Sequence, residues 1–180
     1  SSSRKCLALA NQFQNIYASI GVHPHDASKV SEQNWLELES LGKEPKVVAV
    51  GETGLDYYRN RSPHEDQQRL FRKHLTLAKA NNLPVIIHCR DAYEDLLRIL
   101  RERQTAPYCG TLHCFSSNAA TMVKFTELGF HIAFGGALNE LEDLIHRLTL
   151  AHHLNHVGHG VHFFGAFFLF NQTLVKRGGR

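Results

Sequence analysis

The sequence predicts an α/β fold in which short strands alternate with helices along the chain. Short runs rich in β-branched and apolar residues recur between segments that have helical spacing. These runs are continuously apolar, which is typical of strands buried on both faces of a parallel sheet. Polar side chains able to bind a metal follow several of the runs, at the edge where parallel α/β proteins carry their functional sites.

The predicted elements follow one another as βα units. The strands are expected at residues 16–23, 47–54, 84–90, 110–115 and 131–136, and the helices at 32–41, 65–81, 93–103, 118–128 and 138–150. Ser31 precedes the first of these helices and is expected to cap it. Leu70, Phe71 and His74 begin an apolar stripe on the second, which follows Pro63.

The chain has 180 residues, of which 43% are apolar and 21% charged, and its formal net charge is +3. These values fit a single globular domain with a sizeable core. The chain is nevertheless shorter than the ~250 residues that a complete eight-unit (β/α) barrel usually needs. The net charge is too small to predict a nucleic-acid partner by itself.

Several classes of protein are disfavoured. No apolar run approaches the ~18 residues that span a bilayer, and no apolar signal-peptide core follows Ser1 to Arg4. We therefore expect a cytoplasmic protein with no membrane partner. The four cysteines contain no CxxC pair, so reduced thiols are expected. Strand alternation predicts that Cys89 and Cys114 are buried and point away from any site.

The composition changes near residue 141. Residues 146–162 contain six histidines, and residues 163–170 contain five of the eleven phenylalanines. We therefore expect two regions, a barrel-type α/β region at 1–140 and a divergent His/Phe-rich tail at 141–180.

Glu52 is the first candidate for chemistry. It follows the run Val47–Gly51 directly and is flanked by Gly51 and Gly54, which would let the backbone turn sharply and let an ion approach closely. A carboxylate there could bridge two divalent ions or act as a general base. The structural alternative is a glutamate that caps a helix or is simply solvated.

Histidines follow three of the other strands. His88 and His113 each end an apolar run, so both imidazoles are expected at the edge that carries Glu52. Such a set of nitrogen and oxygen donors suits Zn²⁺, Mn²⁺ or Mg²⁺-type hydrolytic chemistry. His23 and His25 flank Pro24, and this turn could either bind a metal or shape a loop that contacts substrate. A hydrogen-bonded core histidine is the alternative for each.

Aromatic and guanidinium groups are expected near the same edge. Arginine forks match phosphate oxygens, so they indicate a phosphate-containing substrate. The alternative is ordinary solvated surface. The residues are Tyr57, Tyr58, Arg59, Arg61 and Arg90.

Five ordered motifs resemble the TatD-type metal-dependent deoxyribonucleases. They are GVHPHD (21–26), VGETGLDYYR (50–59), IIHCRDA (86–92), LHCFS (112–116) and FGG (134–136), and the resemblance covers roughly residues 7–140. It implies a (β/α) TIM-barrel metal-dependent hydrolase that holds divalent ions, ideally two, at its carboxyl-terminal rim. The implied activity is hydrolysis of phosphodiester bonds, with DNA trimmed from its 3′ end.

The resemblance also implies residue roles. Glu52 would be the catalytic, metal-bridging carboxylate, and His88 and His113 would be metal ligands. His25, Tyr57, Arg59 and Arg90 would contact the substrate on its phosphate side.

Two family motifs do not occur in this sequence. The family's metal site also uses an N-terminal DxHxH motif and a late aspartate of ETD type, and neither is found here. We therefore expect an incomplete barrel of about five βα units and an incomplete set of metal ligands, which leaves the activity and the oligomeric state of this chain open. The alternatives are a non-catalytic metal-binding or interaction module and an amidohydrolase acting on a small substrate.

Overall fold

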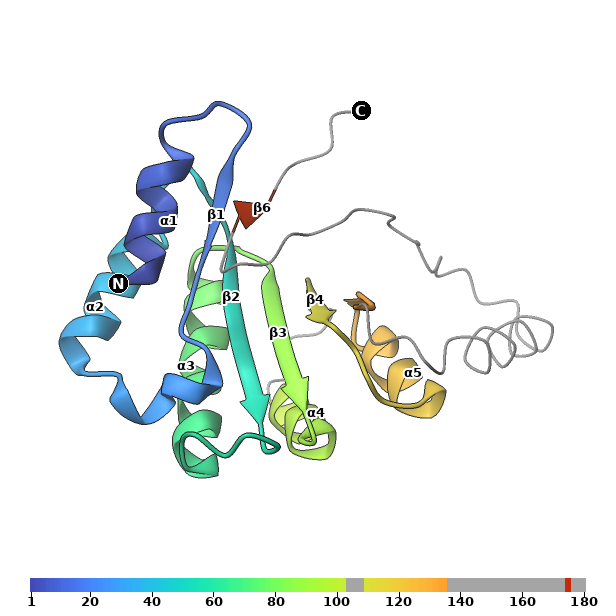
Figure 1. Cartoon of the computed structure of the whole chain (residues 1–180). Helices are drawn as coiled ribbons and strands as arrows, with labels where there is room; N and C mark the ends of the chain where they lie inside the picture. The colour runs from blue at the N-terminus through green and yellow to red at the C-terminus, as the bar shows by residue number, and fades with distance from the viewer. Residues whose placement is uncertain (103–108, 136–173, 176–180) are drawn as a thin grey trace.

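A parallel sheet organises the chain in the computed structural model, which describes residues 1–102, 109–135 and 174–175 (Figure 1). Its parallel strands are β1 (Tyr17–Ile20), β2 (Val47–Asp56), β3 (Val85–Arg90), β4 (Gly110–His113) and β5 (Phe130–Ile132). They lie side by side in the order in which they occur along the chain. A short strand, β6 (Leu174–Val175), pairs antiparallel with β1.

One helix precedes β1, and the others connect the parallel strands, as the βα repeat requires. They are α1 (Ser2–Ala10), the 3₁₀ helix η1 (Pro24–Lys29), α2 (Glu32–Leu41), α3 (His64–Ala80), α4 (Tyr93–Glu102) and α5 (Ala119–Glu127). In Figure 1, α3 lies behind β2, against which it packs. The α/β class expected from the sequence is confirmed, and the described residues contain the five predicted parallel strands, the first four of them each followed by a helix.

The sequence did not predict helix α1. Its only wholly buried positions are Ser3, Leu7 and Ala10, so its apolar face is narrow and contains small residues. Such a face gives little periodic signal. The predicted helix at 138–150 lies outside the described residues, as does the tail at 141–180 except for β6.

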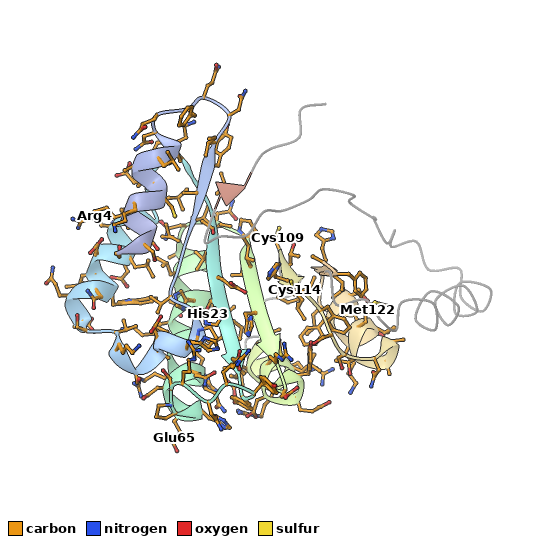
Figure 2. All side chains as sticks on the ribbon, viewed as in Figure 1. Arg4, His23, Glu65, Cys109, Cys114 and Met122 are labelled. Atoms are coloured by element: carbon orange, nitrogen blue, oxygen red, sulfur yellow. The ribbon has the colours of Figure 1, made fainter. Side chains whose placement is uncertain are left out.

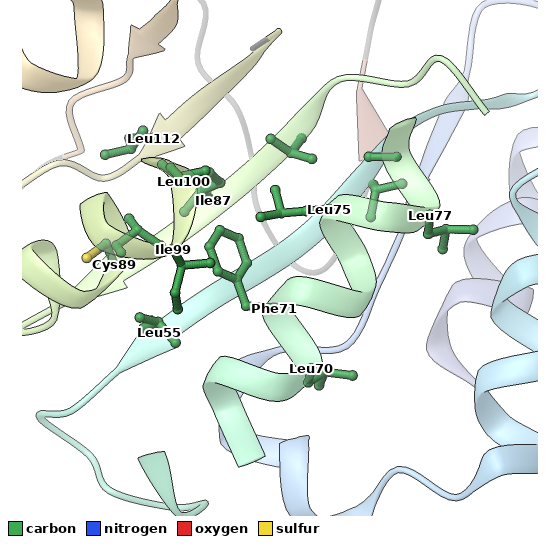
Figure 3. Close-up of a cluster of buried hydrophobic side chains, with 14 of the residues drawn as sticks. Leu55, Leu70, Phe71, Leu75, Leu77, Ile87, Cys89, Ile99, Leu100 and Leu112 are labelled. Carbon is green, nitrogen blue, oxygen red and sulfur yellow. The ribbon is translucent and has the colours of Figure 1, made fainter. Parts of the chain in front are cut away.

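The core lies between the sheet and the helices α3 and α4. In Figure 3, Phe71 and Leu75 project from α3 toward the strands that carry Leu55 and Ile87. Ile99, Leu100 and other fully buried side chains of α4 extend this cluster. Side chains of β2 and β3 are therefore buried on this face of the sheet.

Ser31 caps α2 as expected. Its hydroxyl accepts a hydrogen bond from the Asn34 backbone N–H, and the Asn34 side chain accepts one from the Ser31 N–H. We expect Ser31→Ala to lower the free energy of unfolding by about 1 kcal/mol, because the Asn34 backbone N–H loses the hydroxyl that accepts its hydrogen bond. Urea denaturation measures this, with Ser40→Ala, an exposed change in the same helix, as control. Equal stability of the two variants would contradict the prediction.

The four cysteines are free thiols. Two of them, Cys89 and Cys114, were predicted to be buried, and only one of the two is. Cys89 is buried in β3 as expected. The prediction for Cys114 is wrong, because this residue is exposed. It follows the last residue of β4 and has a φ of 48°, so strand alternation no longer sets the direction of its side chain. Within the described ranges, no helix is both long and apolar enough to cross a bilayer.

Candidate metal centre

Three side chains that can bind a metal come together at the carboxyl ends of neighbouring strands. His23 follows β1, Glu52 lies in β2 and His88 lies in β3. One donor atom from each lies within 4.8 Å of the other two, and all three side chains are partly accessible. Figure 2 shows His23 beside the lower part of β2. Two strands and one strand-to-helix loop therefore build a compact set of one oxygen and two nitrogen donors.

Glycines let the strands approach closely around Glu52. A Cβ atom on Gly51 would lie 2.7 Å from the Cβ of Ile86, and the peptide bond between Gly51 and Glu52 is cis. Gly54 has a φ of 130°, and a Cβ there would lie 2.0 Å from the backbone oxygen of His88. Only glycine fits this contact without moving the backbone. The close approach expected at these two glycines from the sequence is thus observed.

His88 lies between two carboxylates. Its Nδ1 is 3.2 Å from Oε1 of Glu52, and its Nε2 is 2.9 Å from Oδ2 of Asp56. Burial alone would lower the pKa of His88, but the two carboxylates raise it above its usual value. Burial would likewise raise the pKa of Glu52, but the hydrogen bond and charge of His88 lower it. Glu52 is therefore an ionised oxygen donor.

Asp56 ends β2 and is only 2% exposed. Its Oδ2 accepts hydrogen bonds from Nε2 of both His25 and His88, each 2.9 Å long. Its Oδ1 accepts a 2.7 Å bond from the Arg59 backbone N–H. Burial opposes ionisation of Asp56, but these three hydrogen bonds lower its pKa to about 2. The carboxylate thus joins η1 to β3.

His23 is held as a neutral ring. Burial, followed by the nearby charge of His88, lowers the pKa of His23 to about 4, although Glu52 acts in the opposite direction. Its Nδ1 accepts a hydrogen bond from the His25 backbone N–H at the start of η1. Neutral imidazole is the form that binds metals.

His113 borders this group without belonging to it. It pairs with His88 in the register of β3 and β4. Burial lowers the pKa of His113 below its usual value, although the charge of Glu52 acts in the opposite direction. Its Nε2 lies 3.0 Å from the Cys114 sulfur. Among the described residues, the close donor group contains His23 rather than His113.

The residues expected to contact substrate lie in two different settings. Arg90 and Arg59 place their guanidinium carbons 4.4 and 5.3 Å from the ring centre of Tyr58, which is 54% exposed. Tyr57 instead donates a 2.7 Å hydrogen bond to Asp95 of α4, and burial together with this bond raises its pKa to about 12. His25 turns its Nε2 toward Asp56.

The sequence analysis did not single out Asp56 and the two buried residues that support this site. The Gln67 side chain accepts from the backbone N–H of Asp56 and donates to the Asp56 carbonyl. The His74 Nε2 accepts from the Val22 N–H, next to His23, and its Nδ1 donates to the Leu70 carbonyl. Both are 0% exposed. Gln67 and His74 could have been identified as polar residues on the apolar face of α3, because a buried polar side chain needs a hydrogen-bond partner.

His74 predicts a pH dependence of stability. Burial lowers its pKa from 6.5 to about 4, so the unfolded chain binds a proton more readily. The stability that neutral, buried His74 contributes is complete above pH 6.5 and is lost as the pH falls toward 4. Over this range the free energy of unfolding falls by up to about 1.4 kcal/mol per pH unit. We expect His74→Gln to have a flatter profile than the wild type in urea denaturation at pH 4–8. His131→Gln, an exposed control, should match the wild type; identical profiles for all three proteins would contradict the prediction.

The donor set fits a divalent ion. A partly buried carboxylate that is ionised and a neutral imidazole are already in place, and His88 offers a second ring nitrogen toward Glu52. Mixed nitrogen and oxygen donors of this kind suit Zn²⁺ and Mn²⁺. Mg²⁺ prefers a site with fewer nitrogen donors. A parallel α/β sheet with such a group at its carboxyl edge defines the class of metal-dependent hydrolases with (β/α) barrels.

Comparison with known proteins identifies the family. The family model described as TatD related DNase matches residues 1–154, and the chain belongs to this family. The metal-dependent hydrolase YabD of Bacillus subtilis (strain 168) is 39% identical over 132 residues, which cover 73% of this chain and 52% of that protein. The 3′-5′ ssDNA/RNA exonuclease TatD of Salmonella typhimurium is 35% identical over 134 residues, 74% of this chain and 52% of the relative.

The fold has a solved counterpart. The crystal structure of YJJV, a TatD homologue from Escherichia coli K12, matches with a TM-score of 0.72 and 34% identity. The match covers 82% of this chain and 57% of that structure. The TIM-barrel-like fold expected from the resemblance is confirmed, and the chain spans about half the length of the relatives it matches.

Proposed function

We propose that this chain is a divalent-metal-dependent hydrolase that cleaves phosphodiester bonds of DNA from the 3′ end. The observation that carries the proposal is the His23, Glu52 and His88 group at the carboxyl edge of the sheet. The names of the relatives, a metal-dependent hydrolase and a 3′-5′ ssDNA/RNA exonuclease, support the reaction class.

Glu52 and His88 would hold the ion together with His23. His113, expected as a ligand from the resemblance, would extend the group toward β4. A bound divalent ion would polarise a phosphoryl oxygen and lower the pKa of a bound water. Glu52 faces His88 through a 3.2 Å ion pair, so its carboxylate is oriented before any ion enters.

The surface beside this group would take the phosphate backbone. No carboxylate in the described part of the chain forms an ion pair with Arg59 or Arg90, whereas Arg69, Arg72 and Arg98 on the outer helices are paired. A guanidinium without an acidic partner can bind phosphate oxygens in a bidentate manner. Arg59 and Arg90, with Tyr57 and His25, are therefore the proposed substrate contacts.

A nuclease assay tests the proposal. The chelator-treated protein is mixed with a single-stranded DNA oligonucleotide labelled at its 5′ end, and Mg²⁺, Mn²⁺ or Zn²⁺ is titrated. We expect a ladder of products that shorten from the 3′ end only when metal is present. Binding of Mn²⁺ without release of nucleotides would reject the enzyme and favour the non-catalytic metal-binding module. Hydrolysis of small amide or lactone substrates but not of DNA would favour the amidohydrolase.

A further inference from the structure

Asp56 has a role that goes beyond the proposed ligands, although its relevance to metal binding rests on the proposed function. It lies within hydrogen-bond distance of two imidazoles that come from different parts of the chain, His25 in η1 and His88 in β3. An ionised carboxylate can only accept hydrogen bonds. Both Nε2 atoms that face Asp56 must therefore carry protons.

The proton on Nε2 determines what the other ring nitrogen can do. Charged His88 can donate to both carboxylates, from Nε2 to Asp56 and from Nδ1 to Glu52, 3.2 Å away. When His88 gives up one proton, keeping the proton on Nε2 leaves the lone pair on Nδ1. The opposite tautomer would place a proton on Nδ1 and block it as a ligand. The contact with Asp56, at 2.9 Å, is also the shorter of the two carboxylate contacts.

The carboxylate itself is fixed on every side. Oδ1 accepts the Arg59 N–H, and the buried Gln67 amide bonds both the N–H and the carbonyl of Asp56. Gln67 also donates to the Ser62 carbonyl, and the Ser62 hydroxyl donates to the His25 carbonyl. One chain of hydrogen bonds therefore holds the carboxylate and the backbone of the histidine that it orients.

We propose that Asp56 is the positioning residue of the metal centre: it keeps the Nε2 protons on His25 and His88 and thereby commits Nδ1 of His88 to the ion beside Glu52. Carboxylate–histidine pairs of this type orient metal ligands, and losing the carboxylate costs 10–100-fold in metal affinity. Asp56 touches neither substrate nor ion in this arrangement and acts through the two imidazoles.

The first test needs no variant. Long-range ¹H–¹⁵N NMR spectra of the metal-free wild type at pH 9 report which nitrogen of each neutral imidazole is protonated. We expect protonated Nε2 and bare Nδ1 in both His25 and His88. A proton on Nδ1 of His88 overturns the proposal, and this result does not depend on whether the chain cleaves DNA.

The second test uses Asp56→Asn, with Asp66→Asn as the matched control. Asparagine has one oxygen for three donors, and its NH₂ group facing the rings would favour the opposite tautomer. We expect His88 to populate the Nδ1–H form and the dissociation constant for Mn²⁺, measured by isothermal titration calorimetry, to rise about 10–100-fold. The control changes an exposed ion pair with Arg69 on α3 and should alter neither value.

The outcomes separate the two proposals. If Asp56→Asn keeps the wild-type tautomers or the wild-type Mn²⁺ affinity, Asp56 is not the positioning residue. If the wild type binds no Mn²⁺, the proposed function fails, while the tautomers of the metal-free protein still decide the inference about Asp56. If Asp56→Asn does not fold, as thermal melting would reveal, the wild-type spectra remain decisive.

Discussion

Glu52→Gln is expected to raise the dissociation constant for Mn²⁺ by at least about 100-fold and to remove metal-dependent nuclease activity. Loss of a supporting group already costs 10–100-fold, so loss of a charged ligand should cost at least the upper end of that range. Glutamine keeps the shape but brings no charge to His88, whose Nδ1 faces the carboxylate at 3.2 Å.

Calorimetric titration with Mn²⁺ and the oligonucleotide assay measure the two effects. Glu127→Gln, at the exposed end of α5, changes the same chemical group away from the site and should retain wild-type values. Wild-type Mn²⁺ affinity in Glu52→Gln would show that the ion binds elsewhere, and the proposed centre would be wrong.

Gly54→Ala should be the most destabilising of the changes considered. Gly54 pairs with His88 in the register of β2 and β3, has a φ of 130°, and leaves only 2.0 Å between a new Cβ and the His88 carbonyl oxygen. An alanine must therefore both adopt a strained backbone and push apart two central strands. We expect a loss of about 3 kcal/mol or more in the free energy of unfolding.

Thermal unfolding checks this, and a fall of roughly 10 °C in the melting temperature is expected. Gly42→Ala is the matched control, because Gly42 has an ordinary φ of −60° and its nearest neighbour would be the Asn81 side chain at 3.3 Å. A melting temperature for Gly54→Ala equal to that of the control would contradict the strand contact described here.

The arrangement of βα units could be predicted because each unit has its own local signal. Ser31 caps α2, and the apolar stripe of α3 with Phe71 packs on the sheet, as periodicity indicated. The convergence of Glu52 and His88 was also predictable, because parallel strands end at one edge. That conclusion needs only the order of the strands, not their detailed geometry.

Asp56 could not be found by the same reasoning. The predicted strand ended at residue 54, whereas β2 continues to Asp56. With the strand end two residues later, alternation places Asp56 on the same side as Glu52, and both contact His88. The sequence signal was present as the spacing of two carboxylates, but Gly54 between them suggested a turn.

The participation of His23 depends on tertiary contacts that leave no periodic signal. Its loop is fixed by His74, which lies 52 positions from Val22 along the chain and bonds its backbone. The position of Cys114 likewise depends on where β4 stops. Boundaries of elements, rather than their existence, thus limited what could be inferred about the site.

The register of the central strands has a consequence for how the site opens. His88 is aligned with Gly54 on one side and with His113 on the other through the backbone ladders of β2, β3 and β4. A slip of β3 or β4 by one residue would turn the side chain of His88 or His113 to the opposite face of the sheet. Main-chain hydrogen bonds between β2, β3 and β4 therefore fix the distance between the residues of the site. We expect amide hydrogen exchange to be slow at His88 and its paired residues. In this protein, His88 is then expected to leave the metal centre only when the central strands of the sheet open.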